Sequence, residues 1–167
     1  HVRLEDVKTT FGAQIQSLAA LKARLAADLV GRIKAHADLL ARFRLLLSLP
    51  GVGPIVAATL VVRMPELGQM KHGQAAALLG VAPFDRDSGQ FKGVRIIGGG
   101  RKRPRRQVYM AALCAKAHDP TFRAIAEQLL ARGKPTKVVL VAIMRRLIEA
   151  ANLVLHRGQP WVRQTEH

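Results

Sequence analysis

The residues best suited to chemistry are cations, and they gather between residues 84 and 106. This stretch carries eight Lys and Arg against two Asp, the densest positive charge in the chain. Guanidinium and ammonium groups bind phosphates through charge-assisted hydrogen bonds. The residues that we expect to contact phosphate are Lys92, Arg95, Arg101, Lys102, Arg103, Arg105 and Arg106, followed later in the chain by Lys134 and Lys137.

A second phosphate site is predicted at Gly51, Val52 and Gly53. Residues 49–60 have the form of a helix–hairpin–helix: a Leu-Pro lead-in, a Gly-x-Gly turn and a helix whose alanines permit close packing. The exposed amides of such a hairpin and the amino terminus of its second helix attract anions. The alternative is a structural corner between two helices that touches no ligand.

Ser88 lies inside the basic stretch, in an Asp-Ser-Gly tripeptide typical of a turn. A serine hydroxyl is a weak nucleophile without a base or a metal, and no His or Lys lies within one turn of it in the sequence. Lys92 and Arg95 are suited instead to stabilising charge on a phosphate. From the residues alone, a turn is therefore the simpler interpretation of Ser88. Asp85 and Asp87 are interpreted as turn caps in preference to metal ligands.

The charge balance points to a polyanionic partner. The chain has 167 residues, 27 Lys and Arg against 11 Asp and Glu, a formal charge of +16 and a pI near 11.5. Nucleic acid is the first candidate for such a surface. The 49% hydrophobic content indicates a folded protein, and the 4% aromatic content counts against a platform that stacks several bases.

Cysteine, histidine and hydropathy exclude several classes of protein. Cys114 is the only cysteine, which excludes a disulfide framework and a cysteine-based zinc site and is compatible with a reducing cytoplasm. The histidines lack ligand spacing and are interpreted as structural or surface residues; the four considered are His36, His72, His118 and His156. We find neither a signal peptide nor a stretch long enough to span a membrane.

The amino-terminal quarter reads as one long amphipathic helix over residues 3–47. Its apolar residues recur every three or four positions, with a mean of about 3.6, which is helical without a strict heptad. Such a stripe needs cover from a second copy, from a segment upstream of His1, or from the rest of the domain. We expect a homo-oligomer formed partly through this helix, with residues 1–47 as a coiled-coil linker and 48–167 as the nucleic-acid-binding domain.

The remaining elements predict a mainly α-helical fold. A short helix is expected at 74–79, and residues 84–100 read as a small β-hairpin or ordered loop that ends in a flexible glycine junction at 98–100. Three helices follow. The first covers about 102–117; the second begins with Asp119 as N-cap and Pro120 at its first position; the third runs from near Pro135 to before Gly158.

Several segments in this order resemble the carboxy-terminal domain of the one-ten family of insertion-sequence transposases. They are LPGVGPIVAATLV, QAAALLGVAPFDRDSGQFKGVRIIGGGRKRPRRQVYMAALCA, GKPTKVVLVAIMRRLI and GQPW. The resemblance implies a helix–hairpin–helix at 49–60, Ser88 as a nucleophile that links covalently to the DNA backbone, a Gly-Gly-Arg motif at Gly99, Gly100 and Arg101, and a Gly-Lys turn at 133–134.

The resemblance also implies partners that the residues alone do not. Such enzymes act on double-stranded DNA, some are directed by a structured guide RNA, and a separate resolvase-like domain carries four acidic residues that hold a divalent metal such as Mg²⁺. No metal ligand is expected in this chain, which alone should be inactive. The family often has Phe-Tyr and Arg where Ile125, Ala126 and Gln128 stand here, and Pro104 is a further departure.

Two alternatives stay open at this point. The chain is either part of a DNA recombinase that supplies a serine nucleophile, or a non-catalytic helix–hairpin–helix module with Ser88 in a turn. In either case the basic face binds DNA or structured RNA, because both present phosphates.

Overall fold

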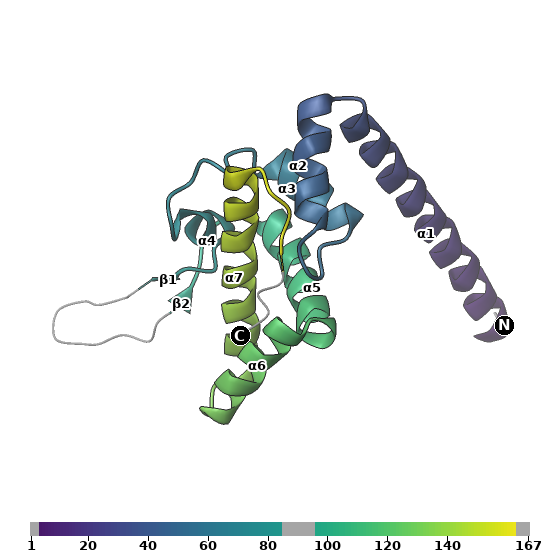
Figure 1. The fold of residues 1–167 in the computed structure, drawn as a ribbon. Helices are drawn as coiled ribbons and strands as arrows, with labels where there is room; N and C mark the ends of the chain where they lie inside the picture. The colour runs from purple at the N-terminus through teal and green to yellow at the C-terminus, as the bar shows by residue number, and fades with distance from the viewer. Residues whose placement is uncertain (1–3, 85–95, 163–167) are drawn as a thin grey trace.

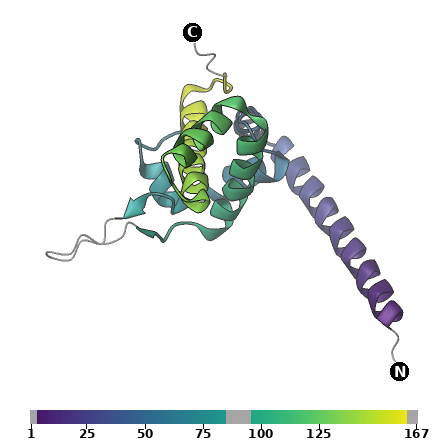
Figure 2. The same ribbon diagram turned by 90° about the horizontal axis from the view of Figure 1, so that it is seen from below.

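The computed structural model describes residues 4–84 and 96–162 and confirms a mainly α-helical fold (Figure 1). In chain order the elements are α1 (Leu4–Lys34), α2 (Ala37–Leu47), α3 (Pro54–Arg63), α4 (Gln74–Leu79), β1 (Pro83–Phe84), β2 (Ile96–Ile97), α5 (Lys102–His118), α6 (Pro120–Ala131) and α7 (Thr136–Arg157). Helix α1 projects from one side of a helical body, and the two short strands lie on the other side in both views (Figures 1 and 2).

The prediction of one unbroken helix over residues 3–47 was wrong. The helix stops at Lys34, His36 is extended with φ −115° and ψ 116°, and α2 then turns back beside α1 (Figure 1). The turn lets both helices reach the core, because Ile33 at the end of α1 and Phe43 and Leu46 of α2 are buried. In a straight helix, either Ile33 or the pair of Phe43 and Leu46 would lie away from the core. The predicted boundary at 47/48 stays a prediction, although core residues lie before it.

The core is built around α7, which contacts α2, α4, α5 and α6. Its inward face carries Ile143, Leu147 and Ile148, each 2% exposed or less. Where α3 and α5 approach each other, the contact is made by alanines that are nearly inaccessible to solvent. They are Ala57, Ala58, Ala111 and Ala112. Small side chains permit this close approach of two backbones. None of the helices in the described part of the chain is apolar and long enough to cross a membrane.

The predicted caps of α6 and α7 are confirmed. The Asp119 side chain accepts a hydrogen bond from the Phe122 amide at 3.1 Å, Pro120 occupies the first position of α6, and Gly158 ends α7 with φ +63°. Trp161 then packs back on the body, with its ring centroid 6.5 Å from that of Phe122. The Trp161 amide donates to Ser48 Oγ at 2.7 Å, which ties the end of the chain to the end of α2.

Two glycine segments cross at the base of the predicted hairpin. A Cβ on Gly100 would lie 2.3 Å from the Gly80 nitrogen, and one on Gly80 would lie 2.4 Å from the Gly99 oxygen. The Arg101 amide donates to Leu78 O at 2.9 Å across the same crossing. Within the junction predicted at 98–100, Gly100 is closely packed, and this packing fixes the start of α5 against the end of α4. The flexibility expected of the junction stays a prediction.

The crossing also aligns the two strands. Pro83 pairs with Ile97 and Phe84 with Ile96 in antiparallel register. These pairs agree with the expected β-hairpin at its two ends. The rest of the predicted hairpin, including Ser88, Lys92 and Arg95, lies outside the described residues.

Replacing single glycines with alanine separates close packing from backbone conformation. Gly100→Ala should lower the free energy of unfolding by about 3 kcal/mol, because it adds a clash to a positive φ of +68°. Gly99→Ala should cost only about 1 to 2 kcal/mol, since its φ is +66° but its Cβ would meet nothing within 4 Å. Gly98→Ala has neither feature and should be nearly neutral. Urea denaturation of the three variants measures this order; equal losses at Gly99 and Gly100 would contradict the crossing.

Candidate nucleic-acid interface

Three helices, α3, α5 and α7, lack both a side-chain cap and an acidic residue in their first turn. By contrast, α6 is capped by Asp119, and the Glu149 carboxylate accepts hydrogen bonds from the amides of Gly73 and Ala76 at the start of α4. A helix amino terminus carries about half a positive charge. The positive ends of α3, α5 and α7 are therefore the ones left for an anion.

Within the basic cluster that begins α5, two arginines serve the protein itself. Arg101 donates hydrogen bonds to the Glu66 carboxylate from Nη2 at 2.6 Å and from Nη1 at 2.8 Å, and Nη1 also donates to the Arg63 carbonyl. Arg105 donates to the carbonyls of Gly80 and Gly99 at the glycine crossing. Their predicted contact with phosphate stays a prediction, but their immediate role is to hold α5 against the elements that precede it.

The other cations at these helix starts are exposed. Lys102, Arg103 and Arg106 of α5 point into solvent, as do Lys134 and Lys137 beside the first turn of α7. Like charge at a positive helix end destabilises the folded chain, by roughly 0.3 to 1 kcal/mol at each exposed site. An anionic ligand would reverse the sign of that effect. This arrangement is therefore better suited to a bound polyanion than to the free protein.

A groove of about 1100 Å³ brings the starts of α5 and α7 together. Its floor is apolar and includes Ala58 and Val62 of α3 and Val141 and Met144 of α7. The charged residues that line it are all basic; they are Arg63, Arg103, Arg105, Arg106 and Lys137. Among the residues that the structure describes, none of those lining the groove carries a carboxylate. The sequence predicted the cations but not the groove, because the groove forms only when elements distant in the sequence meet: Leu29 of α1 and Ile97 of β2 line it together with residues of α3, α5 and α7.

The Gly51–Gly53 turn connects two helices as predicted, but one of its amides is not available to a ligand. The Val52 amide donates to Leu49 O at 3.1 Å, and the Val52 side chain is buried. Gly51 packs on α5, where a Cβ would lie 2.2 Å from the Ala111 oxygen. Val52 and Gly51 hold the turn in place, and their predicted contact with phosphate stays a prediction.

The amino terminus of α3, which follows this turn, is available to a ligand. Pro54, its first residue, lies beside Lys34 and Arg44 in a hollow of about 430 Å³. Gly53 is the N-cap, with no side-chain hydrogen bond to the first turn. A phosphate at this end would meet a helix dipole and two cations rather than a row of hairpin amides.

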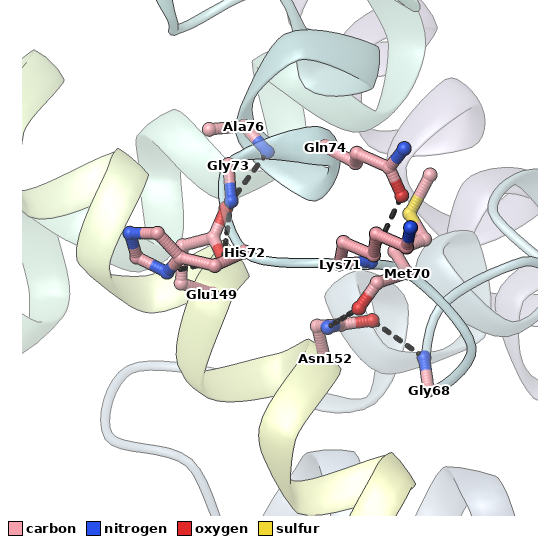
Figure 3. A network of polar contacts seen from close by, with 9 residues as sticks. All are labelled: Gly68, Met70, Lys71, His72, Gly73, Gln74, Ala76, Glu149 and Asn152. Atoms are coloured by element: carbon pink, nitrogen blue, oxygen red, sulfur yellow. Dashed lines mark hydrogen bonds and ion pairs between the residues drawn. The ribbon is translucent and has the colours of Figure 1, made fainter.

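A polar network on α7 positions the segment before α4, and sequence reasoning missed it (Figure 3). The Asn152 side chain accepts from the Gly68 amide at 2.7 Å and donates to Met70 O at 2.8 Å. Glu149 bonds the first turn of α4, and His72 Nδ1 lies 3.6 Å from its carboxylate. The signal was present as two polar residues three positions apart among the apolar residues of the second half of α7. The network fixes α4 and hence the approach to the glycine crossing.

The described residues do not form a metal site. Across residues 4–84 and 96–162, no group of three or more His, Cys, Asp or Glu side chains could hold an ion. The divalent metal that the family resemblance implies does not fit these residues. Ser88, Lys92, Arg95 and the neighbouring Asp85 and Asp87 all lie outside the described residues.

Comparisons with known proteins agree with the resemblance noted in the sequence. The profile described as "Transposase IS116/IS110/IS902 family" matches residues 43–127. A pilin gene-inverting protein of Moraxella bovis is 27% identical over 124 residues, which are 72% of this chain and 38% of that protein. An uncharacterized 43.6 kDa insertion element IS110 protein of Streptomyces coelicolor is 29% identical over 68% of this chain and 28% of its own length. The chain thus matches well under half of each relative.

The pairing of Glu66 with Arg101 predicts a pH-dependent contribution to stability. The hydrogen bonds from Arg101 hold the pKa of the Glu66 carboxyl below its ordinary value of 4.5. The unfolded chain therefore takes up the proton first, so the contribution is complete above about pH 5 and is lost as the pH falls through the lower folded pKa. At pH 7, Glu66→Gln should lower the free energy of unfolding by about 0.5 to 1 kcal/mol.

Denaturant titrations of wild type and Glu66→Gln from pH 7 to pH 3 measure this difference. It should shrink below pH 4.5, while the exposed Glu127→Gln control should stay near zero throughout. A difference that stays constant down to pH 3 would show that the ion pair does not cause it.

Proposed function

This chain belongs to the IS116/IS110/IS902 transposase family, and we propose that it is the part of such an enzyme that binds double-stranded DNA through the starts of α5 and α7. The observation that carries the proposal is the meeting of exposed cations with two uncapped helix ends around a groove whose described charged residues are all basic. The residues proposed to contact phosphates are Lys102, Arg103, Arg106, Lys134 and Lys137.

Phosphate contacts of this kind dominate affinity and carry no sequence information. Each of the five cations sits on a helix start or a short turn, so its position is set by a rigid element. Arg101 and Arg105 support these contacts by fixing α5, through Glu66 and the glycine crossing. The start of α3, with Lys34 and Arg44 beside it, would add a second contact with the duplex.

We further propose that Ser88 is the nucleophile of strand cleavage. The resemblance of DRDSGQFKG to the family motif supports this role, with Lys92 and Arg95 stabilising the scissile phosphate. In the step, the serine oxygen forms a bond to phosphorus as the bond to the strand oxygen breaks. The serine gives up its proton, and the departing strand oxygen gains one. A hydroxyl of a second strand would later resolve the link.

The exposed stripe of α1 supports a homo-oligomer. Phe11, Ile15, Leu18 and Leu25 are each more than half exposed, and burying such side chains is worth about 1.5 to 3 kcal/mol each. A second α1 would cover the stripe along its length. We propose that copies of the chain associate through it, and that a structured guide RNA, where one is used, shares the basic face with DNA.

Removing the proposed phosphate contacts should reduce both affinity and its dependence on salt. Arg103→Gln with Arg106→Gln should weaken binding to duplex DNA, and the slope of log affinity against log salt should fall by about one for each arginine that is replaced. Fluorescence anisotropy across a range of salt concentrations measures both quantities. The control Arg157→Gln is exposed and lies about 30 Å from Lys137 along α7. Equal effects from the control would contradict the assigned face.

Ser88→Ala in the full-length transposase should abolish the covalent adduct between protein and DNA. Denaturing electrophoresis with an end-labelled DNA strand detects that adduct. The 167-residue chain alone should form none, because the domain expected to hold the metal is separate. Ser17→Ala, on exposed α1, is the matched control and should react normally. An undiminished adduct from Ser88→Ala would assign the nucleophile elsewhere.

Charge placed on the α1 stripe should separate the copies. Ile15→Asp combined with Leu18→Asp should shift the chain to monomer in analytical ultracentrifugation. Gln16→Asp puts one negative charge on a different face of α1 and should leave the assembly intact. A wild-type chain that is monomeric at tens of micromolar would contradict association through α1.

A further inference from the structure

We propose that the groove between α3, α5 and α7 holds an unpaired nucleotide of a nucleic-acid strand, with the base against Tyr109 and the phosphates at Arg103, Arg106 and Lys137. This inference rests on the proposed function and deepens it, because it assigns the form of nucleic acid that this site takes. A fully paired duplex offers phosphates on its outside, but the faces of its bases are stacked on each other. Phosphates alone would leave the apolar surface of the groove uncovered, so they would not use it for binding.

The lining of the groove matches both parts of a nucleotide. In the described part of the chain, every charged residue that lines the groove is a cation, so an anionic ligand is favoured over a protein segment that would bring charges of both signs. Its floor of Ala58, Val62, Val141 and Met144 offers a flat ring only apolar contact. The cations lie at the starts of α5 and α7, beside that floor, where a backbone attached to a buried base would emerge.

Tyr109 is the residue best placed to contact a base. It is the only tyrosine in the chain, it lines the groove, and it is 43% exposed. Its neighbours on the groove, Val62 and Met110, are 50% and 57% exposed. Exposed aromatic and apolar groups in one concave site are typical of a ligand-binding surface. Stacking on an aromatic ring tolerates any base, so this contact would not require a fixed sequence.

The size of the groove limits how many nucleotides it takes. A volume of about 1100 Å³ is at the upper end of small-molecule sites, which suits one or two nucleotides rather than a long strand. The scarcity of aromatics points the same way, because one tyrosine can stack on one base. Such a site would capture a nucleotide displaced from a duplex, or an unpaired nucleotide of an RNA. The chemistry of the two is the same at this surface.

The test compares one strand in paired and unpaired form. Fluorescence anisotropy of the 167-residue chain is measured with a short DNA strand, with its RNA counterpart and with the DNA duplex, all at one low salt concentration. Tyr109→Ala should weaken binding to an unpaired strand roughly tenfold and to the duplex less than about twofold. Tyr109→Phe should retain wild-type affinity. Leu153→Ala removes an equally exposed apolar side chain outside the groove and should change nothing.

The outcomes distinguish the inference from the proposed function. Weaker binding confined to the DNA strand or to the RNA strand supports the inference and identifies its source. The inference is overturned if Tyr109→Ala leaves the affinity for the unpaired strand unchanged, or if it lowers the affinities for strand and duplex equally. In either case, binding of the duplex by the wild-type chain leaves the proposed function intact. A wild-type chain that binds neither form overturns the proposed function itself. A change in oligomeric state without a change in strand affinity would make the groove a protein interface and also overturn the inference.

A second measurement covers the case in which Tyr109→Ala fails to fold, as judged by circular dichroism. A DNA strand with one 5-iodouracil is irradiated with the wild-type chain, and the cross-linked peptide is identified by mass spectrometry. The expected adduct is on Tyr109. Adducts found only outside the groove would overturn the inference.

Discussion

The close approach of Gly80 and Gly100 is the constraint on which the arrangement of this chain depends. Two backbones meet where any side chain would collide, and the bond from the Arg101 amide to Leu78 O fixes their register. From this point α4 ends, β1 and β2 pair, and α5 begins. A backbone contact thus fixes the orientation of the basic cluster of α5. Side-chain packing alone would not fix it. Arg105 reinforces the crossing by donating to carbonyls on both of its segments.

The crossing also explains why the basic cluster divides into two groups. Arg101 and Arg105 face inward onto Glu66 and onto glycine carbonyls, while Lys102, Arg103 and Arg106 face outward. The inward pair stabilises the start of a helix that its own charge would otherwise weaken. The outward group is left without carboxylates nearby on the groove, and Lys137 joins it from α7. Acidic side chains are used at α4 and α6 instead, where Glu149 and Asp119 cap the helices. This separation of charge is what makes one face suited to phosphates.

Much of the helical fold follows from local signals, whereas the site depends on distant contacts. Asp119-Pro120 and Gly158 mark helix ends through capping and backbone conformation, which a sequence displays directly. The break at His36 has no such signal, because it exists to bring Ile33 and Phe43 into one core. The pairing of Arg101 with Glu66 and the capping of α4 by Glu149 join residues that are 35 and 73 positions apart, so neither could be read from spacing. The same holds for the groove, whose lining residues come from α1, α3, β2, α5 and α7. Gly99 and Gly100 were identified from a motif, but their role in close packing became evident only from the atoms that surround them.

The most direct test of the account maps where DNA touches the chain. Backbone amide NMR signals of the 167-residue chain, followed during titration with a short duplex, report each region separately. The largest shifts should occur at residues 102–106 and 136–139, at the starts of α5 and α7, with little change in the last turn of α7. Shifts centred on that last turn or on α6, with the starts of α5 and α7 unaffected, would contradict it.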